Sequence, residues 1–226
     1  MRIGHLNQAQ NKNSRGFSLI EVLIVVGIIG IITAVAIPQI ISQRRLLRSV
    51  QMMRQISTQV RYARQLSMSQ HDVVTFQYDD TNKQIRIIDH NNYQPTNATC
   101  NLLSKDVLVA PGYPMTVCAT VALTIPLAQE GVSSAELTYG IPTSPALPIG
   151  ALGDGIAKTN LTNAAINISF TPEGRVLDTN GAPVNTAMYF FNSSKPEATA
   201  SAISVIGASG RVKIWRYSSS AGIYAE

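Results

Sequence analysis

Apolar residues run from Phe17 to Ile37 with a single charged residue, Glu21, among them. A helix of about 21 residues is long enough to cross the hydrocarbon core of a bilayer. The run exceeds the roughly 7 to 15 apolar residues of a secretory signal; "AVA" at residues 34–36 resembles a signal cleavage site, but Pro38 follows it closely. A plain anchor leaves Glu21 unexplained, because a charge at the centre of a span is disfavoured by about 2.5 to 3.5 kcal/mol.

Beyond Pro38 the apolar residues recur every three or four positions, which predicts an amphipathic continuation of the helix to about Ser69. This apolar stripe is expected to pack on a globular head, and it consists of Leu46, Val50, Met53, Ile56, Val60 and Ala63. Six arginines lie between Arg44 and Arg64, with no acid among them. The pattern leaves open whether they contact anionic lipid headgroups, acidic neighbouring subunits or only solvent.

After His71 the hydrophobic period changes to two. The segments "VVTFQY" and "QIRII" flank "DDTNK" and predict a hairpin, and "AINISF", "AMYFF", "AISVI" and "RVKIWRY" predict further strands. Residues 91–163 are poorly periodic, and the regularly spaced prolines of "GIPTSPALPIG" favour an extended loop. The expected fold is α+β: a long helix over residues 17–70, with 17–37 transmembrane, then a mainly antiparallel β-rich head over 71–226 with an insertion at 91–163.

Charge distribution gives the expected orientation. The chain has 226 residues and a net charge of +5, yet from Asp72 onward twelve acids outnumber nine bases. Three bases precede the apolar run, so the positive-inside rule places the N-terminus in the cytoplasm and the head outside the inner membrane. In an oxidising compartment, Cys100 and Cys118 are expected to form a disulfide rather than a metal site; two free buried thiols are the alternative.

The segment "GFSLIE" at residues 16–21, after a basic leader and before an apolar helix, resembles the prepilin signature of type IV pilins and type II secretion pseudopilins. The resemblance implies that a prepilin peptidase cleaves the leader, residues 1–16, between Gly16 and Phe17, and that the new Phe17 amine is methylated. It implies that Glu21 pairs with the amine of a neighbouring subunit during filament assembly. Pro38 lies where this family places a helix-kinking proline.

The C-terminal half resembles the heads of the GspH/FimT group, with "FTPEGR" at residues 170–175 and "GRVK" at 210–213 as the matching motifs. This group implies a minor type IV pilin of the FimU/FimT kind, which primes assembly at or near the pilus tip. Implied partners are other minor pilins, the major pilin and the inner-membrane assembly platform. The resemblance leaves two alternatives: a minor pseudopilin of a type II secretion system, and a DNA-binding pilin for natural transformation.

The sequence offers little catalytic chemistry. The three histidines are isolated, no hydrolase or nucleotide-binding motif is present, and neither a cofactor nor a metal site is expected. For DNA, strand alternation in "GRVKIWRY" places Arg211, Lys213 and Trp215 on one face, where two cations could contact phosphates and an indole could stack on a base. Such cations also occur on solvent-facing edge strands, where they discourage strand pairing.

Overall fold

The computed structural model describes residues 18–90, 120–127, 136–143, 152–178 and 181–226. The expected cleavage and methylation site at Gly16 and Phe17, and the expected disulfide between Cys100 and Cys118, lie outside these residues and stay predictions. The chain divides into two compact units, Met1–Gln43 and Arg44–Glu226. Each unit is described by itself below.

Helix α1 runs from Leu19 to Gln70 as one element, with Glu21 in its first turn. Pro38 lies inside it. The sequence prediction of a long N-terminal helix ending near Ser69 is therefore confirmed for the described residues. After Gln70 the chain turns at His71, which has a positive φ of 55°, and Asp72 donates its backbone N–H to the Ser67 carbonyl.

The first sheet contains β1 (Val74–Asp79), β2 (Gln84–Asp89), β3 (Thr120–Pro126) and β5 (Ala165–Phe170), in the order β3-β2-β1-β5. All its pairs are antiparallel. The predicted hairpin is confirmed: β1 and β2 pair from Val74 with Asp89 to Asp79 with Gln84. The Asp79 carboxylate accepts the backbone N–H groups of Thr81 and Asn82, and so closes the polar turn.

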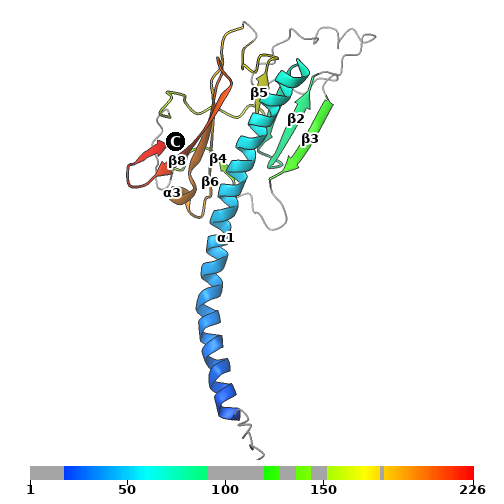
Figure 1. The fold of residues 1–226 in the computed structure, drawn as a ribbon. Helices are drawn as coiled ribbons and strands as arrows, with labels where there is room; N and C mark the ends of the chain where they lie inside the picture. The colour runs from blue at the N-terminus through cyan, green and yellow to red at the C-terminus, as the bar shows by residue number, and fades with distance from the viewer. Residues whose placement is uncertain (1–17, 91–119, 128–135, 144–151, 179–180) are drawn as a thin grey trace, which may run out of the picture. The chain divides into compact units, whose positions relative to one another are not determined.

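The second sheet contains β4 (Thr138–Tyr139), β6 (Thr186–Phe191), β7 (Ser201–Ile206), β8 (Arg211–Ser218) and β9 (Ile223–Ala225), in the order β4-β6-β7-β8-β9. It is antiparallel throughout. A short helix, α3 (Pro196–Thr199), links β6 to β7. In Figure 1 the C-terminal half of α1 lies against the head, with β2 and β3 on one side of the helix and β4, β6 and β8 on the other.

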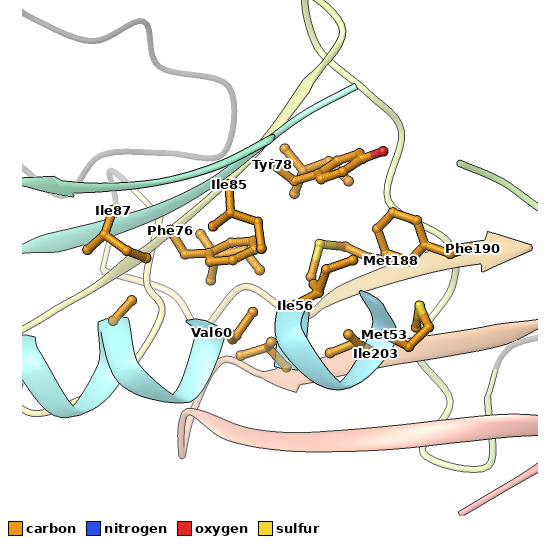
Figure 2. Close-up of a cluster of buried hydrophobic side chains, with 14 of the residues drawn as sticks. Met53, Ile56, Val60, Phe76, Tyr78, Ile85, Ile87, Met188, Phe190 and Ile203 are labelled. Carbon is orange, nitrogen blue, oxygen red and sulfur yellow. The ribbon is translucent and has the colours of Figure 1, made fainter. Parts of the chain in front are cut away.

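The main core lies between α1 and the two sheets (Figure 2). The helix contributes fully buried Ile56 and Val60, as its apolar stripe predicts. The first sheet contributes Phe76 and Tyr78, and the Tyr78 ring meets Phe190 of the second sheet edge to face at 5.0 Å between centroids. Helix and sheets therefore share one core, and the predicted α+β head is confirmed.

A second cluster covers the other face of the second sheet. Tyr189 of β6, Trp215 of β8 and Tyr224 of β9 pack there with Leu152 and Ile156. The last two residues belong to the C-terminal part of the predicted insertion. Both faces of this sheet are consequently covered, one by α1 and the other by the segment 152–156.

Candidate functional site

The N-terminal part of α1 is a candidate membrane segment. Residues 19–37 have a mean hydropathy of 2.8, and none of this span is buried inside the molecule. Within the described residues it is the one helix whose length and composition suit a membrane crossing. The described residues do not cover these apolar side chains, as a membrane or neighbouring apolar helices would.

Glu21 lies in the first turn of this apolar helix and is exposed. The partial positive charge of a helix N-terminus favours a carboxylate there by about 0.3 to 1 kcal/mol. Glu21 is the third residue of the apolar span Leu19–Ile37 and lies near its end. The pairing that the sequence predicts for its carboxylate stays a prediction.

Strand β8 carries the residues predicted to bind DNA, and the structure pairs them with an acid. Lys213 Nζ lies 2.9 Å from Glu226 Oε2, and an Arg211 nitrogen lies 3.8 Å from Glu226 Oε1. The hydrogen bond from Lys213 lowers the pKa of the Glu226 carboxyl below its usual value. Arg211 is exposed, whereas the Lys213 side chain is 17% exposed. The acid therefore offsets part of the positive charge of this face.

Trp215 departs from the expectation of an exposed stacking surface. Its indole is only 5% exposed, and Nε1 donates to Ser204 Oγ at 2.9 Å. Ser204 in turn donates to the carboxylate of Asp154, and Gly153 lies against the ring, where an added Cβ would be 3.0 Å from the indole. The indole is a core group in this structure and is not available to an unpaired base. DNA binding by Arg211 and Lys213 stays a prediction.

Arg64 of α1 joins the two motifs on which the family resemblance of the head depends. Its guanidinium donates to the carbonyl of Gly174 at 3.0 Å and to that of Ser209 at 3.0 Å. Gly174 belongs to "FTPEGR" and Gly210 to "GRVK", and they have positive φ values of 73° and 63°. A Cβ on Gly210 would lie 1.9 Å from the Gly174 oxygen. Both motifs are therefore turns that fix the two sheets to the helix.

A buried polar group lies on the first sheet, facing away from α1. Thr75 Oγ1 is 2.8 Å from both His90 Nε2 and Ser169 Oγ. Burial lowers the pKa of His90, while Asp72 and Asp89 partly oppose this shift. Because Thr75 and Ser169 are 3% and 4% exposed, a substrate has no direct access to their hydroxyls. The arrangement is that of a core hydrogen-bond network.

Metal ligands do not gather in the described part of the chain. No group of three or more His, Cys, Asp or Glu residues there could hold a metal ion.

The sequence does not predict the contacts of three residues that hold the head together or pair with β8: Arg64, Asp154 and Glu226. The sequence pattern marks Arg64 only as one of the bases of the amphipathic helix. Its contacts with Gly174 and Ser209 span 110 and 145 residues, and no local pattern encodes them. Asp154 lies in "GDG", a turn sequence, but its contact with Ser204 spans fifty residues and no local pattern encodes it.

One of three comparisons with known proteins bears on the N-terminal assignment. The family model for the prokaryotic N-terminal methylation motif matches residues 11–37. A search of curated proteins gave no significant match. Among solved structures, the type IV minor pilin FimU of Pseudomonas aeruginosa is similar over 73% of this chain and 85% of that chain, with 14% sequence identity and a TM-score of 0.37.

Proposed function

We propose that this chain, a type IV pilin-like protein by its N-terminal methylation motif and its α+β fold, is a minor type IV pilin that primes pilus assembly and lies at or near the pilus tip. The observation that carries the proposal is a lone carboxylate, Glu21, in the first turn of an otherwise apolar helix that follows a matched methylation motif. A plain membrane anchor has no use for this charge.

The carboxylate has a partner in the proposed mature protein. Cleavage after Gly16 makes Phe17 the first residue, so its amine is a positive charge at the start of the same apolar helix. When a subunit leaves the bilayer and joins the filament, Glu21 meets the Phe17 amine of a neighbour in apolar surroundings. A buried charge without a partner is strongly unfavourable there, and the pair therefore fixes the axial position of one subunit on the next.

The proposed membrane topology and partners follow from this role of the N-terminal helix. Residues 17–37 hold the subunit in the inner membrane before assembly, with the head on the periplasmic side. The proposed partners are a prepilin peptidase, the assembly platform, the major pilin and other minor pilins. The head supplies the surface that distinguishes this subunit from the others in the fibre.

The direct test is the N-terminus of the protein from cells that make the fibre. Mass spectrometry should find a mature chain that begins at N-methylated Phe17, both in membranes and in sheared fibres. A chain that begins at Ile37 would indicate an ordinary signal peptide and would remove the basis for assembly.

A minor pseudopilin is the second candidate, because the methylation motif serves both classes of fibre. Deletion of the gene separates the two functions: loss of surface pili with normal protein secretion supports the minor pilin, and the reverse result supports the pseudopilin. A DNA-binding pilin has weaker support, since Trp215 is buried and Glu226 pairs with Lys213. A gel shift that the Arg211→Ala, Lys213→Ala double variant abolishes would restore that candidate.

A further inference from the structure

One face of the head half of α1 is exposed along its whole length. It comprises Arg44, Leu47, Arg54, Thr58, Arg61 and Tyr62, and is called the arginine face below. At 100° per residue these positions lie within one side of the helix. Met53, Ile56 and Val60 occupy the opposite side and are buried in the core. The helix therefore turns its cationic side away from its own head.

The charge on this face lacks a counterpart in the part of the chain that the structure describes. After Glu21 no acid occurs in α1. The ion pairs of Asp79, Asp80 and Glu226 are made with bases of the head, and none of these pairs includes Arg44, Arg54 or Arg61. The three arginines thus form a positive stripe of about 25 Å at 1.5 Å per residue.

The face also carries two large apolar side chains. Leu47 is 61% exposed and Tyr62 is 43% exposed. Arginine and tyrosine are enriched in protein interfaces and among the residues that contribute most to binding. A stripe of this length exceeds the roughly 5 to 8 Å depth of one headgroup layer. The composition therefore favours a protein surface over a lipid or a nucleic acid as the occupant.

A second copy of this chain is a poor occupant. Two arginine faces repel each other when they meet. The exposed acids in the described head are Glu173, Glu197 and Glu226, which belong to three separate segments of the chain, and Glu226 already pairs with Lys213. No continuous acidic stripe is therefore available on the described surface of a second copy.

We infer that the arginine face docks an acidic surface on a different pilin-type subunit, and that it disfavours contact with a second copy of this chain. The inference rests on the proposed function and adds the chemistry of the partner. Charge complementarity of this kind selects partners and suppresses wrong ones, because like charges in contact are unfavourable. It would disfavour fibres built from this subunit alone, because stacking one copy on another would bring like charges together.

The test uses the full chain in cells that assemble the fibre. In the first arm, the Arg54→Glu, Arg61→Glu double variant is compared with Arg216→Glu, which reverses an exposed arginine on β8. We expect the double variant to enter sheared fibres roughly tenfold less than wild type, and Arg216→Glu to enter normally. Arg54→Lys, Arg61→Lys keeps the charge and should enter like wild type. Normal entry of the double reversal would overturn the inference.

The second arm does not depend on a charge reversal. Tyr62 is replaced by the photoreactive p-benzoylphenylalanine, and the adducts formed on illumination are identified by mass spectrometry. An adduct with an acidic segment of another pilin-type subunit is expected. Adducts with a second copy, with lipid or with nucleic acid, or an absence of adducts in assembled fibres, would each overturn the inference.

The N-terminus of each variant is sequenced in parallel. If the wild-type chain is cleaved before Phe17 and is found in fibres, the proposed function holds. It holds even where the variants show that the arginine face binds no partner. Absence of the wild-type chain from every fibre is instead a failure of the proposed function itself.

Discussion

At the scale of single residues, glycines decide how closely the turns of this head approach each other. Gly174 and Gly210 both have positive φ, which a residue with a Cβ adopts at a cost. They also lie against each other, with Arg64 beside them. Gly210 combines a positive φ with a close approach to the Gly174 carbonyl. A side chain is therefore tolerated least at this position of the contact between the two turns.

We predict that Gly210→Ala lowers the free energy of unfolding by about 3 kcal/mol or more, because it adds backbone strain to a collision with the Gly174 carbonyl. Urea denaturation of the full chain in detergent measures the loss. Gly222→Ala is the matched control: its φ is 68°, but nothing lies within 4 Å of an added Cβ. That variant should lose only about 1 to 2 kcal/mol from the backbone conformation. Equal losses in the two variants would contradict the role of close contact.

His90 predicts a dependence of stability on pH. Burial holds the pKa of its imidazole below the ordinary 6.5, so the folded chain binds this proton less readily than the unfolded chain. The contribution of neutral His90 is complete above pH 6.5 and is lost as the pH falls below it. The free energy of unfolding should therefore decrease between about pH 8 and about pH 5.

The His90→Gln variant isolates this contribution, since glutamine keeps a polar group near Thr75 but does not titrate. Its unfolding free energy should depend less on pH than that of wild type over the same range. Parallel pH profiles for the two proteins would show that another group is responsible.

At the scale of elements, the segment 152–156 and strand β8 hold each other in place. The contact combines Gly153 against the Trp215 ring with the hydrogen bonds from Trp215 to Ser204 and from Ser204 to Asp154. Asp154 Oδ1 also accepts the backbone N–H of Ile156 at 3.2 Å. A single carboxylate therefore orders the loop and attaches it to the sheet.

We predict that Asp154→Ala loosens this segment and exposes the indole. Trp215 is the only tryptophan of the chain, so its fluorescence reports on this contact alone. Emission should shift to longer wavelength, and quenching by acrylamide should increase. The loss of stability should be about 1 to 3 kcal/mol, because a buried hydroxyl loses its acceptor.

Glu197→Ala is the control for the loss of an acid, since Glu197 is exposed on α3. It should leave both fluorescence and stability unchanged. Unchanged emission in Asp154→Ala would mean that the segment stays on the sheet without the carboxylate.

At the scale of the whole molecule, α1 serves two different environments. Its first part is apolar on all sides and carries Glu21, whereas its second part buries one side in the head core. We predict that Glu21→Ala leaves cleavage and membrane insertion intact but reduces entry into fibres at least tenfold. The reason is that loss of one member of a buried ion pair is unfavourable by about 3 to 5 kcal/mol.

Glu21→Gln keeps the shape of the side chain and removes its charge, so it should fail like Glu21→Ala if the pair is ionic. Immunoblots of sheared fibres and of membranes, taken from the same cells, measure entry and insertion separately. Entry of Glu21→Gln at the wild-type level would show that the charge has no role in assembly.

The sequence by itself determined the elements whose pattern is local. The continuous helix, the β1–β2 hairpin and the C-terminal strands follow from a hydrophobic period of three to four or of two, and from turn residues between them. The methylation motif is likewise a short run of adjacent residues. Backbone geometry fixes each of these patterns within a few residues, and distant parts of the chain are not needed to recognise them.

Only the tertiary structure decided which faces are covered. Alternation correctly placed Arg211, Lys213 and Trp215 on one face of β8, but the segment 152–156 covers Trp215 and Glu226 neutralises part of the charge. The contact of the Gly174 and Gly210 turns with Arg64 could not be predicted from the sequence either, because it joins three segments far apart in the chain. Periodicity tells which residues share a face, whereas burial depends on the segment that packs against that face, and long-range packing alone selects that segment.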